Sequence, residues 1–375
     1  MQTVWFCLVA IMIAMYVVLD GFDLGAGAIH LWVAKDDGER QQVIRSIGPV
    51  WDGNEVWLLA AGGTLYFAFP VLYASGFSGF YLPLMIVLWL LILRGIAVEF
   101  RGHLTSPVWL KFWDVVFAGA SLLLAVFYGA ALGNVVRGVP LNDQGYFFEA
   151  LWTNFRLGPN TGVLDWYTIV VGVTALVTLT LHGALWLTVK TEGPVHDRSF
   201  QLARGAWWIL LLLTIALTVI TFVIQPGIPM NLAAHPWGYI FPALALSGLA
   251  AMTWFMRKQD ELKSFLASCA YIVGMLTSVV FGLYPLVLPA STNPVYSLTI
   301  DNTKAGDYGL RIGLAWWIVG MILVACYSIY VYRSFAGKVK IGESQNGYQK
   351  FISPGRLKSE VCTGSRGIPA NSPER

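Results

Sequence analysis

Two pairs of acidic residues lie in largely apolar stretches of this chain. Asp52 and Glu55 are three residues apart in the motif WDGNEVW, and Asp20 and Asp23 repeat that spacing in LDGFDLGAG. In a helix, this spacing places both carboxylates of a pair on one face. An ionised side chain at the centre of a bilayer costs about 3 kcal/mol, so acids in such segments indicate a site that moves protons or ions.

The composition is that of an integral membrane protein. Of the 375 residues, 57% are hydrophobic and only 12% are charged, which is about half the charged fraction of a typical soluble domain. Nine segments are apolar and long enough to cross a hydrocarbon layer of about 30 Å as helices. These predicted helices are residues 3–33, 50–73, 77–98, 112–134, 164–189, 203–224, 236–256, 265–288 and 310–333.

The predicted helices form two units of four and one further helix. Residues 1–134 hold the first four helices, residues 164–288 the next four, and residues 310–333 the ninth. Together they are expected to make one all-α transmembrane domain, residues 1–335. Residues 336–375 lack hydrophobic periodicity and are predicted to be a disordered cytoplasmic tail.

The distribution of positive charge predicts the orientation of the helices, because cytoplasmic connections of membrane proteins retain Lys and Arg. With the N-terminus outside, twenty of the 24 Lys and Arg residues fall on the inner side. Only Arg137, Arg156, Lys304 and Arg311 fall on the outer side. The prediction is therefore N-out and C-in. The net charge of +3 reflects this topology, and no nucleic-acid partner is expected.

This orientation places Asp20, Asp23 and Asp52 at one depth, toward the cytoplasm. Carboxylates gathered in a low-dielectric layer can hold and pass on protons, which favours a proton entry path. Two structural explanations stay open. Asp52 could cap the start of its helix, and Asp20 and Asp23 could form ion pairs with Arg94 or Arg45.

Other residues belong to the candidate site or to its alternatives. Arg94, near the inner end of the third predicted helix, could also clamp an anionic group. Trp51 and Trp57 flank the acids of the second helix, whereas most of the 16 Trp residues are expected to be interfacial anchors. His182 lies deep in apolar sequence, but bis-histidine haem ligation would need a second intramembrane His facing it. The chain is therefore not expected to ligate haem by itself, and the four Cys residues lack metal-type spacing.

Several sequence blocks resemble subunit II of the cytochrome bd quinol oxidases, including the cyanide-insensitive variants. The blocks are LDGFDLGAG at 19–27, SIGPVWDGNEVWLLAAGG at 46–63, FPVLYASGFSGFY at 69–81, LRGIAVEFR at 93–101, KTEG at 190–193 and PASTNPVYSLTIDN at 289–302. They are far longer than generic short motifs. The tail from about Ile341 carries no family motif.

The resemblance implies a nine-helix subunit that forms a heterodimer with subunit I in the bacterial inner membrane. In that family, subunit I carries two b-type haems and haem d and oxidises quinol, and dioxygen is reduced to water with generation of a proton motive force. Subunit II supports the haem region and supplies protons from the cytoplasm. A small single-helix accessory subunit could be a further partner, and membrane lipids surround the complex.

The resemblance also implies a role for Asp52, which is the aspartate of the WDGN motif and the key residue of the proton route in the family. Asp20, Asp23 and Arg94 lie in family motifs as well. The predicted site consists of Asp20, Asp23, Asp52 and Glu55 as the proton path, and Arg94, Trp51 and Trp57 as support of the haem region in the partner.

Two other functions are compatible with acids in membrane helices. A proton-coupled secondary transporter would use the same side chains, but transporter sites commonly lie near the midplane between discontinuous helices. A structural scaffold would use the acids only to pair with buried cations. The preferred interpretation is a subunit of a quinol-dependent oxygen reductase, with Asp52 as the inner proton acceptor.

Overall fold

The computed structural model describes residues 1–158 and 161–340. In these residues, the α-helices are α1 (Gln2–Val33), α2 (Asp37–Ile47), α3 (Trp51–Ala68), α4 (Pro70–Gly79), α5 (Tyr81–Phe100), α6 (Pro107–Arg137), α7 (Trp166–Lys190), α8 (Pro194–Ile224), α9 (Gly227–Ala234), α10 (Ile240–Arg257), α11 (Glu261–Leu283) and α12 (Asp307–Ser334). Strands β1 (Leu286–Leu288) and β2 (Leu298–Thr299) pair antiparallel. The predicted tail lies outside the described residues from residue 341 onward.

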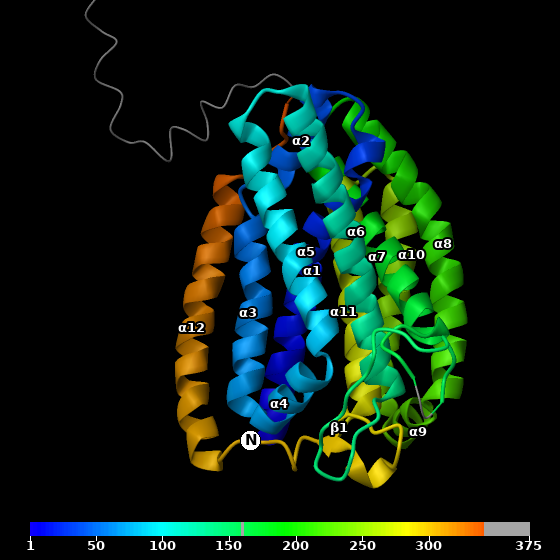
Figure 1. Cartoon of the computed structure of the whole chain (residues 1–375). Coiled ribbons are helices and arrows are strands. Elements are labelled where there is room, and N and C mark those ends of the chain that lie inside the picture. The colour runs from blue at the N-terminus through cyan, green and yellow to red at the C-terminus, as the bar shows by residue number, and fades with distance from the viewer. Residues whose placement is uncertain (159–160, 341–375) are drawn as a thin grey trace, which may run out of the picture. The chain divides into compact units, whose positions relative to one another are not determined.

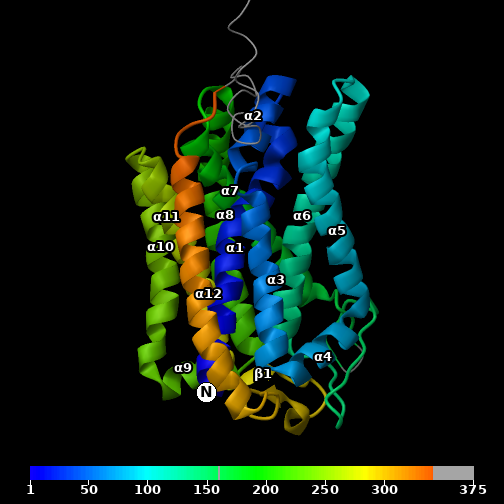
Figure 2. The same ribbon diagram turned by 90° about the vertical axis from the view of Figure 1, so that its left-hand side faces the viewer.

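The long helices of residues 1–339 run side by side in one bundle, as Figures 1 and 2 show. The short elements α4, α9 and β1 lie at the end that holds the N-terminus, and α2 lies at the opposite end. Within the described residues, eight helices are long and apolar enough to cross a membrane: α1, α5, α6, α7, α8, α10, α11 and α12. The predicted helical membrane architecture is confirmed, with a small two-stranded ribbon in addition.

The predicted helix 50–73 is divided in the structure. Helix α3 ends at Ala68, and α4 begins at Pro70. Proline lacks a backbone donor and disfavours helical geometry in the residue before it, so the chain turns at Phe69. Helix α3 is not among the eight apolar helices, because its first turn carries polar side chains, including Asp52 and Glu55.

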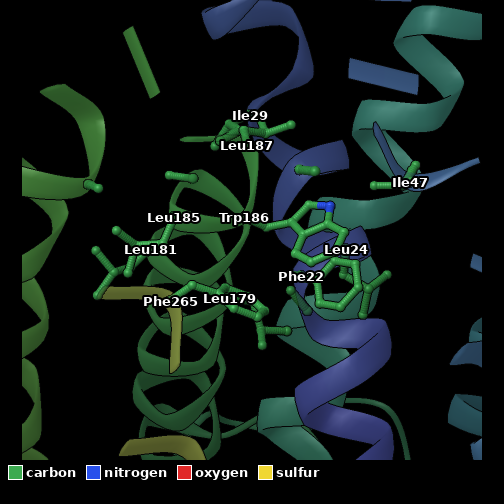
Figure 3. Close-up of a cluster of buried hydrophobic side chains, with 14 of the residues drawn as sticks. Phe22, Leu24, Ile29, Ile47, Leu179, Leu181, Leu185, Trp186, Leu187 and Phe265 are labelled. Carbon is green, nitrogen blue, oxygen red and sulfur yellow. The ribbon is translucent and has the colours of Figure 1, made fainter. Parts of the chain in front are cut away.

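The hydrophobic core lies where α1, α7 and α11 meet (Figure 3). Phe22 of α1 stacks on Trp186 of α7 with a centroid separation of 4.0 Å, and Phe265 of α11 meets Phe22 edge-on. Leu24 and Ile29 of α1 and several leucines of α7 belong to the same cluster. The core therefore fixes α1 at the centre of the bundle, against helices from the second half of the chain.

Two glycines allow α1 and α7 to approach closely. A Cβ added to Gly183 would lie 2.3 Å from the backbone nitrogen of Ala26, and one added to Gly25 would lie 1.8 Å from the carbonyl oxygen of Leu179. Small residues at such crossings let helix backbones touch in membranes. The close crossing holds the acidic residues of α1 at a fixed height.

We expect Gly183→Val to destabilise the protein, because the new side chain would push α7 away from α1. Overpacking of this kind costs about 1–3 kcal/mol. The matched control is Gly205→Val on α8, where an added Cβ meets nothing within 4 Å. The measurement is the unfolding midpoint of the purified complex in detergent. Equal midpoints for the two variants would contradict a tight crossing.

Candidate functional site

Arg94 of α5 is buried and joins acids from two other helices. Its Nη1 donates to Asp20 Oδ1 at 2.6 Å, and its Nη2 donates to Glu55 Oε2 at 3.0 Å. The guanidinium carbon lies 5.8 Å from the centre of the Trp51 ring. The side chain of Arg94 is 1% exposed, so α1, α3 and α5 meet around one buried cation. One of the two ion pairs considered for Asp20 in the sequence analysis, the pair with Arg94, is therefore present.

Asp23 lies one helical turn from Asp20 and is held by a second set of contacts. Asn54 Nδ2 of α3 donates to Asp23 Oδ2 at 2.8 Å and to the carbonyl of Leu19 at 3.2 Å. The Tyr332 hydroxyl of α12 donates to Asn54 Oδ1 at 2.9 Å. The amide of Asn54 thus connects Asp23 to the last helix of the bundle.

Asn54 and Tyr332 were not predicted from the sequence. Asn54 could have been found, because an amide in the first turn of an apolar helix needs a partner as much as the acids beside it do. Nothing in the sequence points to Tyr332, which is one Tyr among 16 and meets Asn54 only after the whole chain has folded.

Two carboxylate oxygens in this cluster make no hydrogen bond within the described residues. They are Asp20 Oδ2 and Asp23 Oδ1, and both are buried. Buried polar atoms are almost always satisfied by protein or by ordered water. The cluster also has three carboxylates, Asp20, Asp23 and Glu55, around one guanidinium. The two unpartnered oxygens can therefore bind water. Because carboxylates outnumber the guanidinium, one of them can also take up a proton while the ion pair with Arg94 stays in place.

Asp52 and Trp57 are not part of this cluster. Asp52 is exposed in the first turn of α3 and makes no hydrogen bond or ion pair among the described residues. Trp57 is buried with Tyr16 and other residues of α1 in a separate apolar contact. Of the predicted site residues, the structure thus brings together Asp20, Asp23, Glu55, Arg94 and Trp51.

His182 is engaged at both ring nitrogens. Nε2 lies 2.9 Å from the Val18 carbonyl and Nδ1 lies 2.7 Å from Ser268 Oγ, while the ring stacks on Phe265. These contacts link α1, α7 and α11 and leave neither nitrogen available to a metal. In the described part of the chain, no group of three or more His, Cys, Asp or Glu side chains is arranged to hold a metal ion.

A second buried ionic group lies in the connection between α6 and α7. Arg137 bonds both Asp165 and Glu149, with 2.8 Å between its Nη2 and Glu149 Oε1. Burial raises the pKa of Glu149 to about 7, and the negative charge of Asp165 adds to this rise, although Arg137 and the hydroxyl of Thr161 lower the pKa. The group lies at the end of the bundle opposite α2 and is separate from the Arg94 cluster.

The fold and the site define a multi-helix membrane protein with a buried cluster of carboxylates around one arginine. The model of the family described as cytochrome bd terminal oxidase subunit II matches residues 1–335. The chain belongs to this family, which makes it a subunit of a respiratory terminal oxidase and confirms the resemblance seen in the sequence.

Individual relatives are similar along most of their length. The chain is 30% identical to a probable cytochrome oxidase subunit 2 of Haemophilus influenzae, over 90% of this chain and 95% of that one. It is also 30% identical to a cytochrome bd ubiquinol oxidase subunit 2 of Bacillus subtilis, over 83% and 89%. A chain in the structure of the bd oxidase from Geobacillus thermodenitrificans has the same fold, with a TM-score of 0.69 and 17% identity over 89% of this chain and 98% of that one.

We expect Arg94→Met to destabilise the complex strongly, because three carboxylates would lose their buried cation. Breaking a buried ion pair from one side costs about 3–5 kcal/mol. Adding Asp20→Asn to this variant should recover part of the loss, since one fewer charge is left unpaired. Arg311→Met, at an exposed position, is the control. Chemical unfolding in detergent is measured for the wild type, these three variants and Asp20→Asn alone, and additive effects of the two substitutions would contradict direct pairing.

We expect the connection between α6 and α7 to loosen as pH rises. The pKa of Glu149 is raised from its ordinary value of 4.5 to about 7, so the folded loop keeps a proton that the unfolded loop releases. The stability that the protonated carboxyl contributes is fully present below pH 4.5 and is lost as the pH rises from 4.5 to about 7. Proteolysis of the loop at pH 5 and pH 8 should show this change, and Glu149→Gln should abolish it. Equal pH dependence in the variant would refute the assignment.

Proposed function

We propose that this protein is the subunit of a quinol-oxidising, oxygen-reducing bd-type complex that conducts protons from the cytoplasm toward a haem-bearing subunit I. The observation that carries the proposal is the buried cluster around Arg94, where acids from α1 and α3 surround a single cation and two carboxylate oxygens have no protein partner. Such a group has the capacity to accept protons inside the bundle. Its location inside the helical bundle fits a role in proton supply.

The proposal includes nine spans with the N-terminus outside and the C-terminus inside. Helix α3 has 18 residues and extends about 27 Å, which is close to the thickness of the hydrocarbon layer. It lies beside α1 and α12 in both views of the bundle (Figures 1 and 2). The positively charged connections at the α2 end support an inner position for that end. The grouping into two four-helix units and a ninth helix stays a prediction.

Asp52 gives the proposal its entry point. It is exposed on the flank of α3, together with the apolar side chains of Val56 and Leu59. A carboxylate facing hydrocarbon would cost about 3 kcal/mol, so we infer that subunit I, with some water, covers this flank. Glu55 lies three residues further along α3 and is 23% exposed in the isolated subunit, so it connects the flank with Arg94 and the buried cluster.

We place the two b-type haems and haem d in the partner, as the resemblance implies. His182 does not fit haem ligation, because both of its ring nitrogens are hydrogen-bonded. His30 is held by Asp114 through Nε2, and His103 and His235 lie at the ends of helices. The role of Trp51 is then indirect, since its ring supports the guanidinium that holds the acids.

We expect Asp52→Asn to lower quinol-driven oxygen consumption about tenfold or more, because an amide cannot accept and release the proton that oxygen reduction requires. Haem content and assembly should stay unchanged, since Asp52 has no hydrogen-bond partner within this subunit's described residues. Asp143→Asn, an exposed acid in the connection between α6 and α7, is the matched control. The assay is oxygen uptake by the purified, fully haem-loaded complex.

The scaffold alternative is favoured by the ion pair of Asp20 with Arg94. A scaffold predicts that Asp20→Asn lowers the unfolding midpoint while the activity per haem is retained. A proton path predicts that activity per haem falls in both Asp20→Asn and Asp52→Asn. Normal turnover of both variants in intact complexes would rule out the proposed function.

A further inference from the structure

Polar side chains line the contact between α1 and α6 at regular intervals. Seven residues are close to two helical turns, about 10.5 Å, so side chains at this spacing share one face of a helix. On α1 they are Tyr16, Asp23 and His30, and on α6 they are Tyr128, Ser121 and Asp114. We call these six residues the polar seam. Since the two helices are antiparallel, the two sets run alongside each other in opposite order, with Tyr16 beside Tyr128 and His30 beside Asp114.

The two ends of the polar seam are closed by direct hydrogen bonds. Tyr16 Oη donates to Tyr128 Oη at 2.8 Å, and His30 Nε2 lies 2.8 Å from Asp114 Oδ1, to which it donates. His30 and Asp114 are both fully buried. These bonds fix the register of α1 against α6, so the middle residues, Asp23 and Ser121, must lie between them.

Ser121 of α6 lies against Gly27 of α1, whose position in the sequence is between Asp23 and His30. A Cβ added to Gly27 would lie 2.2 Å from Ser121 Oγ, so the hydroxyl rests directly on the α1 backbone. Gly27 lies four residues after Asp23 and three before His30, which places all three on the same face of α1. The glycine therefore makes room for a hydroxyl at the midpoint of a gap of about 10.5 Å between a carboxylate and an imidazole.

Three buried polar atoms of the polar seam have no hydrogen-bond partner among the described residues. They are Asp23 Oδ1, Ser121 Oγ and His30 Nδ1, and each side chain is at most 1% exposed. Buried polar atoms normally bond protein or ordered water. Three such atoms in succession, along one seam, point to a short line of water molecules that connects them.

One end of the polar seam reaches solution. Asp114 also bonds Arg101 at 2.6 Å and Arg40 at 3.1 Å, and Arg101 bonds Asp37 of α2. The side chains of Arg40 and Asp37 are 22% and 66% exposed. The other end of the gap is Asp23, which Asn54 ties to α3. The polar groups thus extend from the surface at α2 to the buried cluster without passing Asp52.

We propose that the polar seam is a second proton inlet, which runs from solution at α2 through His30 and Ser121 to Asp23. The proposal rests on the proposed function, since it supplies the same buried cluster, but it does not use Asp52. His30, Ser121 and Asp23 are its conducting residues, Asp114 orients His30, and Gly27 is a positioning residue.

The proposed transfer moves one proton from solution to Asp23 and leaves His30 and Ser121 in their initial protonation states. Uptake of a proton by the His30–Asp114 pair gives an imidazolium beside a carboxylate, with both ring nitrogens protonated. The Nδ1 proton passes through water to the oxygen of Ser121 as the Ser121 hydroxyl releases its own proton toward Asp23 Oδ1. The carboxylate of Asp23 becomes a carboxylic acid. The ring returns to its neutral form, with the Nε2 proton still donated to Asp114.

The test removes the hydroxyl in the middle of the seam. The fully reduced, haem-loaded complex is mixed with oxygen, and proton uptake from solution is followed with a pH-indicator dye. Because the two inlets run in parallel, the variants are made in the Asp52→Asn background. We expect Ser121→Ala to slow the uptake that remains there about tenfold or more, and Ser121→Thr, which keeps a hydroxyl, to restore most of that remaining rate. The matched control is Ser199→Ala on α8, where the hydroxyl is equally buried and has no partner among the described residues, and it should leave the remaining uptake unchanged.

A second variant tests the proposal if the complex with Ser121→Ala does not assemble. His30→Gln keeps an Nε2 donor for Asp114 but has no second ring nitrogen, so it should also slow proton uptake in intact complexes. Slow uptake in both Ser121→Ala and Ser121→Thr would show a packing effect and overturn the proposal.

Comparison of the single and double variants separates the inlet from the proposed function. Slow uptake in Asp52→Asn that Ser121→Ala does not slow further overturns the polar seam and leaves the proposed function in place. Normal uptake in Asp52→Asn with slow uptake in Ser121→Ala alone supports the seam and removes Asp52 from the route. Normal uptake in the double variant overturns both proposals.

Discussion

The buried guanidinium of Arg94 requires the arrangement of helices around it. Taking an arginine out of water is costly unless acids and hydrogen bonds surround it. Asp20 of α1 and Glu55 of α3 provide those acids, so α1, α3 and α5 have to meet at the same height. The close crossing of α1 with α7 at Gly25 and Gly183 then fixes that height relative to the rest of the bundle.

The polar residues at the start of α3 point to three different sides of the helix. Successive residues of a helix are rotated by about 100°, so Asp52, Asn54 and Glu55 point to different sides. Asn54 faces α1 and Glu55 faces α5, whereas Asp52 faces outward. The three-residue spacing predicted that Asp52 and Glu55 share a face. In the structure, the rotation of about 60° between them is enough to put one in the bundle and the other on its flank.

The apolar segments and the acids of α1 could be predicted because hydropathy and charge are local properties of the sequence. Hydropathy continued through Pro70, however, and so concealed the end of α3 at Ala68. Ser121 gave no signal, since a serine in a membrane helix commonly bonds its own backbone. Its position becomes informative only when α6 lies antiparallel to α1 and Gly27 faces it. The role of a residue such as Ser121 depends on contacts between segments far apart in the sequence, and these contacts cannot be predicted from one sequence alone.

The distribution of charge gives the proposed proton movement a direction. At the α2 end, Asp114 and Asp37 are balanced by Arg40 and Arg101. Around Arg94, three carboxylates face a single cation, so a proton is attracted from the balanced group toward the buried one. Beyond that point, the contact between α1 and α6 holds only the two tyrosine hydroxyls, which carry no charge. A proton that enters from either side is therefore retained at the height of Arg94, where the partly exposed Glu55 joins the cluster to the proposed entry point on the flank of α3.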